Sequence, residues 1–326
     1  MFLCFILLIC SYAAAIPDAP RTRYRHAAVV SGTNVYVIGG TNNQLDANYN
    51  EVCIATVDVF NTVTKTWSTL SDGGATNLDL PVPTTDGAAF VVENTIFYTG
   101  GYATPDYTAS NATWALDLDK VAAGWTRVAD APTHRGDHGA VTLDGVGHVF
   151  GGFSHWDGFA MPVSDLQTFN ATTGKWSVLN AMPTVRGDKA AAILHGRMHV
   201  IGGQTKTAEG ADVPLKDVEV YNPETKTWEN EGDIPTNRFR FSAASHADSI
   251  YIFGGQAFLS GEWNGNGSFY PVVPTVEVFS ENLVPREKND TNPNPNPDGG
   301  GATSSANVVA VSAIASAAFA AALALF

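Results

Sequence analysis

Residues 183–203 read PTVRGDKAAAILHGRMHVIGG, and this stretch contains most of the features that decide the fold. A Pro-x-x-Arg motif comes first, and a run of alanines, a turn and a short apolar run follow it. Two short runs of this kind, joined by a glycine-containing turn, are typical of a β-hairpin. Gly202 and Gly203 end the second run, and paired glycines permit close backbone approach and positive φ. The stretch therefore predicts two antiparallel strands that stop at the double glycine.

The double glycine recurs about every 50 residues. The pairs are Gly39-Gly40, Gly100-Gly101, Gly151-Gly152, Gly202-Gly203 and Gly254-Gly255. An alternating run such as Val218-Glu219-Val220-Tyr221 follows, which predicts a strand with one buried face. Four tryptophans then lie 24 to 27 residues beyond the second glycine of their pair. They are Trp67, Trp125, Trp176 and Trp228. A period of this length predicts a radial repeat in which each unit is one small sheet.

The combination of Gly-Gly, an aromatic residue before a turn and a tryptophan at a fixed offset resembles the kelch repeat over roughly residues 20–283. The resemblance implies an all-β propeller built from four-stranded antiparallel blades. Five units favour five blades, and six is the lesser alternative because each blade would then be too short. Unit two departs from the pattern, with Thr84 in place of the arginine. Unit five has no tryptophan, so its outer strand is expected at Asn282–Arg286 or from the N-terminal segment Ile16–Pro20.

The first 15 residues have the composition of a secretory signal peptide. An apolar run is followed by Ala13-Ala14-Ala15, which suits a cleavage site, although the usual basic start is missing. Residues 16–287 are then the kelch propeller.

The C-terminal residues predict a lipid anchor. Residues 288–306 form a stalk rich in Asn, Pro, Gly and Ser, and residues 307–326 are apolar and uncharged. Small residues, a polar spacer and an apolar tail are typical of a GPI-attachment signal, with Asp298, Gly299 or Gly300 as the attachment point and Ser304 next. A membrane-spanning tail anchor is the alternative. We therefore expect an extracellular protein on the outer face of the plasma membrane.

Glycosylation sequons, charge and cysteines agree with this location. The sequons begin at Asn111, Asn170, Asn266 and Asn289. The chain carries 18 basic and 32 acidic residues, a net charge of -14, which disfavours nucleic acid as a partner. Cys53 alone lies outside the signal segment, so we expect no internal disulfide. We expect a monomer.

The ligand site is expected on one face of the propeller. In a four-stranded blade, the strand two-to-three connections and the links between blades emerge together, and these loops are rich in aromatic residues. The Pro-x-x-Arg arginines lie at the same face, and Arg25, Asp86, Asp137, Asp188 or Arg240 follows two residues later. The candidate ligand-binding residues are Arg23, Arg25, Arg135, Arg186, Arg238, Arg240, Asp137, Asp188, Trp156 and Trp263. The arginines either pair with aspartates across adjacent blades or form a polarised mouth for a ligand with a carboxylate.

The expected function is recognition of a protein or a glycan at the cell surface. We expect no catalytic residue, cofactor or metal, and we assign Arg135-Gly136-Asp137 to the repeat rather than to integrin-type adhesion. The alternative is a carbohydrate-active kelch enzyme. A protein similar to galactose oxidase would need a cysteine beside a tyrosine, and only Cys53 with Tyr49 is available. An enzyme similar to the sialic-acid isomerising kelch proteins would suit an arginine-rich mouth.

Overall fold

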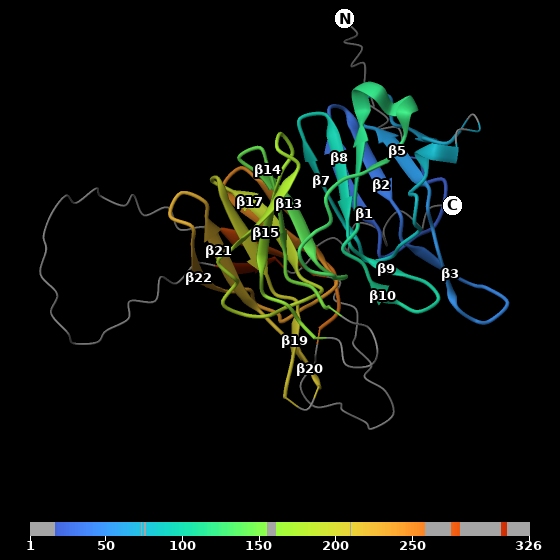
Figure 1. Ribbon diagram of the computed structural model, residues 1–326. Helices are drawn as coiled ribbons and strands as arrows, with labels where there is room; N and C mark the ends of the chain where they lie inside the picture. Colours follow the sequence, from blue (N-terminus) through green and yellow to red (C-terminus); the bar gives the residue numbers. More distant parts are fainter. Residues whose placement is uncertain are drawn as a thin grey trace, which may run out of the picture.

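The computed structural model describes residues 17–72, 74, 76–154, 161–208, 210–257, 275–280 and 308–311. These residues form five four-stranded antiparallel sheets, arranged as propeller blades (Figure 1). The prediction of an all-β propeller with four-stranded blades is confirmed. Among the described residues, no helix is both long enough and apolar enough to span a membrane.

Each blade takes its four strands in the order in which they occur along the chain. Blade one contains β1 (Ala27–Ser31), β2 (Asn34–Ile38), β5 (Val57–Asn61) and β6 (Thr66–Thr69). Blade two contains β7 (Ala88–Val92), β8 (Thr95–Thr99), β11 (Thr113–Asp117) and β12 (Thr126–Arg127). Blade three contains β13 (Gly139–Leu143), β14 (Val146–Phe150), β15 (Leu166–Asn170) and β16 (Lys175–Leu179). Blade four contains β17 (Ala190–Leu194), β18 (Arg197–Ile201), β21 (Asp217–Asn222) and β22 (Thr227–Asp233). Blade five contains β23 (Ser242–His246), β24 (Ser249–Phe253), β25 (Val276–Ser280) and β26 (Val308–Val311). Two short 3-10 helices, η1 (Thr76–Leu78) and η2 (Leu118–Ala123), lie beside blade two.

Small residues on the first strand of each blade let neighbouring blades approach closely at the axis. The double glycines have positive φ, and they lie against the backbone of the segment that leads into their own blade. Gly203 has a φ of +88°, and a Cβ atom there would lie 2.5 Å from the carbonyl oxygen of Gly187. The glycine is therefore required by both its backbone conformation and its surroundings.

Aromatic side chains fill the space between blades. Between ring centroids, Phe97 of blade two lies 5.0 Å from Phe169 of blade three, and Trp176 lies 5.1 Å from Phe169. The tryptophans also bind the chain that precedes their blade, because each indole N–H donates to a backbone carbonyl there. The bonds are Trp67 to Pro17 at 3.0 Å, Trp125 to Leu78 at 3.1 Å, Trp176 to Ala129 at 2.8 Å and Trp228 to Asn180 at 3.0 Å.

The described blades form an arc. The inner strands contact one another in the order β1, β7, β13, β17 and β23, and no comparable contact joins β23 to β1 in the described part of the chain. The exposure of these strands agrees, because four of the five β23 residues are exposed and Val30 of β1 is 60% exposed. Within the described part of the chain, blades one and five therefore do not pack against each other.

Two segments differ from expectation at the ends of the arc. The fourth strand of blade five is β26, in which Val308–Val311 pair with Val276–Phe279. The sequence had favoured Asn282–Arg286 or the N-terminal segment. A run of β-branched valines without proline suits an edge strand better than either of these. In the N-terminal segment, the Pro17 carbonyl instead accepts a hydrogen bond from the Trp67 indole. The Ala129 carbonyl, at the end of blade two, accepts the equivalent bond from Trp176.

Candidate functional site: the loop face and its central mouth

One face of the propeller carries both the strand two-to-three connections and the links between blades, and we call it the loop face. Isolated β-bridges tie the two kinds of loop together, once in each blade. The bridged pairs are Tyr24–Thr41, Thr85–Tyr102, Gly136–Phe153, Gly187–Gln204 and Phe239–Gln256. Three connections extend further as two-stranded ribbons that project to the same side in Figure 1. These are β3 (Thr41–Leu45) with β4 (Glu51–Cys53), β9 (Tyr102–Ala103) with β10 (Thr108–Ala109), and β19 (Gln204–Lys206) with β20 (Asp212–Pro214).

At the centre of the loop face, one residue from each blade lies around the axis. These residues are Arg25, Asp86, Asp137, Asp188 and Arg240, and all have positive φ between 52° and 57°. A continuous series of backbone hydrogen bonds joins them, because each amide donates to the carbonyl of the preceding member, at 2.8 to 3.1 Å. We call this arrangement the mouth. It opens into a cavity of about 350 Å³ that His26, His138, Lys189 and Phe241 also line.

The two arginines of the mouth are already paired. Arg25 Nε lies 2.7 Å from Asp86 Oδ2, and its Nη1 lies 3.3 Å from Glu51 Oε2. Arg240 Nε lies 3.3 Å from Asp188 Oδ2. Glu51 also accepts hydrogen bonds from the hydroxyls of Tyr24 and Tyr107. Each of these two arginines therefore pairs with the aspartate of an adjacent blade, which is the first of the two arrangements expected from the sequence.

The titration of the mouth follows from its burial. Burial, reinforced by the charges of Asp188 and Asp86, raises the pKa of the Asp137 carboxyl well above its usual range. Burial also lowers the pKa of Lys189 and of His138 well below their usual values. Burial disfavours the Glu51 carboxylate, but hydrogen bonds from Tyr24 and Tyr107 and the charge of Arg25 outweigh it and lower the Glu51 pKa.

The four Pro-x-x-Arg arginines lie beneath the mouth and hold each blade together. Arg23, Arg135, Arg186 and Arg238, which we call the blade arginines, have side chains at most 4% exposed. Each donates at 2.9 to 3.0 Å to the carbonyl of the first glycine of its own blade's pair. Each also pairs with an acid before or on the third strand of that blade. The acids are Asp58, Asp165, Asp217 with Glu219, and Glu277.

This burial corrects two interpretations of the blade arginines. They do not pair across adjacent blades, and their side chains are enclosed rather than available to a ligand. Blade two shows that arginine and acid belong together, because both are replaced there. Thr84 stands in place of the arginine and bonds the Tyr98 hydroxyl at 2.8 Å, while Trp114 occupies the position of Asp58 on the third strand.

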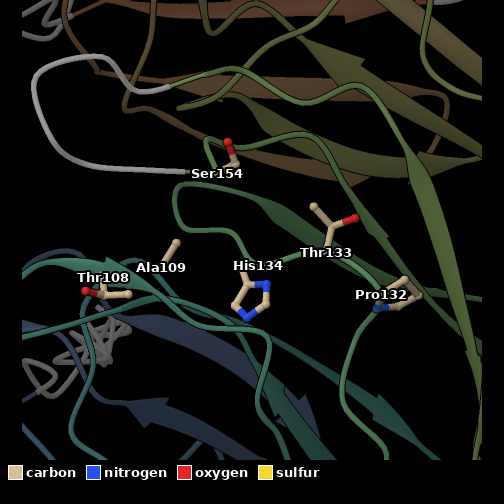
Figure 2. Close-up of a pocket in the computed structure, with 6 residues that line it drawn as sticks. All are labelled: Thr108, Ala109, Pro132, Thr133, His134 and Ser154. Atoms are coloured by element: carbon tan, nitrogen blue, oxygen red, sulfur yellow. The ribbon is translucent and has the colours of Figure 1, made fainter.

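A second cavity of about 390 Å³ lies on the loop face beside β10. It is lined by Thr108, Ala109, Pro132, Thr133, His134 and Ser154. Figure 2 shows the exposed imidazole of His134 with Thr108 and Ala109 on one side and Thr133 and Pro132 on the other. Among the described residues, the lining combines hydroxyl groups with small apolar surfaces and carries no aspartate, glutamate, lysine or arginine. It suits a neutral polar group such as a sugar hydroxyl or a peptide amide.

Several residues that the sequence singled out lie outside the described part of the chain or away from the mouth. Trp156 and Trp263 lie outside the described residues, as do Asn266, Asn289, Asp298, Gly299 and Gly300. Cys53 Sγ lies 3.9 Å from the backbone oxygen of Tyr102, and Tyr49 is 85% exposed. Within the described ranges, no group of three or more His, Cys, Asp or Glu side chains is arranged to hold a metal ion.

The two described sequons differ in accessibility. Asn111 Nδ2 donates to the Ala131 carbonyl at 2.9 Å, and the Thr113 hydroxyl of that sequon is buried against Thr99. Asn170 is exposed at the turn after β15, where its Oδ1 accepts from the Thr173 amide.

We expect N-linked glycan at Asn170 and none at Asn111, because a glycan on Asn111 would break its hydrogen bond in a partly buried position. Peptide mass spectrometry of the chain expressed through a secretory pathway checks this. Full occupancy of Asn111 with a bare Asn170 would contradict the described surroundings of both residues.

Comparison with known proteins identifies the family. The KLHDC2/KLHL20/DRC7 Kelch-repeats domain matches residues 25–255. The chain therefore belongs to the kelch-repeat family, and kelch-repeat proteins generally mediate protein binding.

Individual relatives are distant. The chain is 27% identical to alpha-scruin of Limulus polyphemus over 63% of this chain and 22% of that protein. It is 24% identical to Kelch-like protein 23 of Mus musculus over 77% of this chain and 40% of that protein. The chain thus spans less than half the length of these curated relatives. Kelch domain-containing protein 3 of Bos taurus is 25% identical over 79% of this chain and 70% of that protein. Among solved structures, that of YjhT aligns with a TM-score of 0.65 at 14% identity, over 80% of this chain and 82% of that chain, which supports the fold alone.

Proposed function

We propose that the protein is a recognition module of the cell surface that binds a protein or a glycan through its loop face. One observation carries this proposal. Of the twelve large apolar side chains that the structure shows exposed, eight lie on the loop face. They are Tyr24, Leu45, Tyr49, Val52, Val82, Met161, Val185 and Val213. Of the other four exposed apolar side chains, Val63 lies on a turn at the opposite face. Exposed apolar residues gathered among polar loops are typical of an interaction surface.

Binding arrays test this function. The full chain, purified in detergent, is applied to arrays of extracellular protein domains and of glycans. We expect a saturable partner whose affinity falls at least about 5-fold in His134→Ala and in Leu45→Ala, because truncating a buried interface anchor costs more than about 1 kcal/mol. Val63→Ala is the matched control and should bind as the native protein does. Loss of binding in Val63→Ala alone would place the interaction on the other face.

The same proposal includes attachment to the membrane by a lipid. The apolar residues 307–326 and the polar segment before them support it. Attachment at Asp298, Gly299 or Gly300 would remove β26 and leave β25 as the edge of blade five. We expect phosphatidylinositol-specific phospholipase to release the mature protein from cells. If the protein stays on the membrane, and mass spectrometry finds Phe326 intact, β26 is retained and the tail is not a lipid-attachment signal.

A further inference from the structure

The charges around the mouth do not balance at its centre. Arg25 faces Asp86 at one end of the series and Arg240 faces Asp188 at the other. Asp137 lies between the two aspartates in the series of backbone bonds, and the structure shows no ion pair between its carboxylate and a cation of the described residues. Its Oδ2 atom is buried and has no hydrogen-bond partner there.

The neighbouring bases do not fill this role. Lys189 Nζ donates to the backbone carbonyl of Asp137 at 3.1 Å rather than to the carboxylate, and burial lowers the Lys189 pKa. His138 also lines the cavity, and burial lowers its pKa well below the usual value, so it stays neutral more readily than an exposed histidine. Counting Glu51, the rim and centre of the mouth hold four carboxyl groups against two paired arginines and Lys189, whose charged form burial disfavours. An entering carboxylate would meet this excess of acid, whereas an entering cation would offset it.

We propose that Asp137 is the counterion for a lysine or arginine side chain that a partner inserts into the mouth. This inference rests on the proposed function, because it names the chemistry by which the loop face recognises its partner. The cavity of about 350 Å³ is large enough for one basic side chain, and Phe241 supplies an aromatic wall for its methylene groups. The acidic chain as a whole, with a net charge of -14, attracts basic partners.

Insertion of a cation also moves a proton. Asp137 is protonated when the mouth is empty at pH values below its raised pKa, so pairing with an ammonium or guanidinium group sends that proton to solvent. The groups that face Asp137 are Arg25, Asp86, Tyr102, Asp188 and Lys189, and His138 adjoins it. Since the bound state holds fewer protons than the free state, affinity rises with pH, by up to about 10-fold per unit below the Asp137 pKa.

A random heptapeptide library displayed on phage tests the proposal, selected on the full chain at pH 7.5. We expect selected peptides to share a lysine or arginine at one position. A synthetic copy of the most enriched peptide should bind at least about 30-fold more weakly to Asp137→Asn, the loss typical when one member of a close desolvated charge pair is removed. Replacing its basic residue by norleucine should cost a similar factor, and calorimetry in two buffers should detect proton release only with the native protein.

Asp144→Asn is the matched control, because Asp144 is an exposed turn residue of the same blade with a φ of +51°, against +52° at Asp137. Asparagine tolerates this conformation, so both variants should fold. Selected peptides rich in aspartate or glutamate, or peptides that bind Asp137→Asn normally, would overturn the inference while leaving the loop face as a binding surface. Failure to select any peptide, together with silent protein and glycan arrays, would overturn both proposals.

Discussion

Arg186→Ala is expected to lower the free energy of unfolding by about 3–5 kcal/mol, the loss typical when one partner of a buried ion pair is removed. The Arg186 side chain is fully buried, and its Nη2 lies 2.5 Å from Asp217 and 3.0 Å from Glu219. Its Nη1 donates to the Gly202 carbonyl at 3.0 Å. Without the guanidinium, the Glu219 carboxylate would remain buried and unpaired. Denaturant titration followed by tryptophan fluorescence measures the loss.

Arg127→Ala is the control for this experiment. Arg127 also pairs with an aspartate, Asp130, at 2.7 Å, but both side chains are nearly half exposed. Exposed pairs contribute little because water and salt screen them, so we expect a loss below about 1 kcal/mol. If the two variants lose equal stability, the blade arginines do not hold the blades together, and a direct role in ligand contact must be reconsidered.

Phe169→Ala is expected to cost about 3–5 kcal/mol, because it opens a cavity between blades two and three. Phe169 is 1% exposed, and its ring lies against Phe90, Phe97 and Trp176 with centroid distances of 5.0 to 6.3 Å. The four rings come from two different blades, so the cavity would weaken the contact that fixes one blade against the next. Thermal unfolding by circular dichroism gives the change in melting temperature.

The comparison variant is Val178→Ala in β16, one strand away from Phe169. Val178 is 58% exposed, and truncating an exposed side chain usually changes stability by no more than about 0.5 kcal/mol. A loss for Val178→Ala as large as that for Phe169→Ala would mean that the blades do not pack through the face that carries the phenylalanines.

Much of the fold could be predicted from the sequence, because each blade repeats the same physical requirements. Gly202-Gly203 ends a strand where a Cβ atom would collide with the backbone, and Trp176 occupies a fixed place relative to it. The relation between blades one and five could not be predicted. It depends on packing between segments far apart in the chain, and no local pattern reports that packing. The fourth strand of blade five was also missed, since residues 308–311 read as part of an apolar tail rather than as a strand.

The site was predicted in part. The spacing of two residues after each Pro-x-x-Arg arginine correctly predicted that Asp137 and Asp188 lie at the axis. It did not distinguish the buried blade arginines from the arginines of the mouth. One signal could have done so: acids such as Asp58 and Glu219 lie at the same position of the third strand, and unit two lacks both acid and arginine. Glu51 pairs with Arg25 and accepts hydrogen bonds from Tyr24 and Tyr107. No repeated sequence pattern could have predicted this, because Glu51 lies in a connection that is particular to blade one.

Photo-cross-linking from the two faces tests most directly whether the loop face is the recognition surface. A photoreactive phenylalanine analogue is placed at Leu45, which is 56% exposed on the loop face, or at Val63, which is 70% exposed on the opposite face. Each variant of the full chain is expressed in cells of the source organism, which are then irradiated. We predict a discrete adduct from position 45 that Asp137→Asn weakens, and none from position 63. An adduct from position 63 with none from position 45 would contradict the assignment of recognition to the loop face.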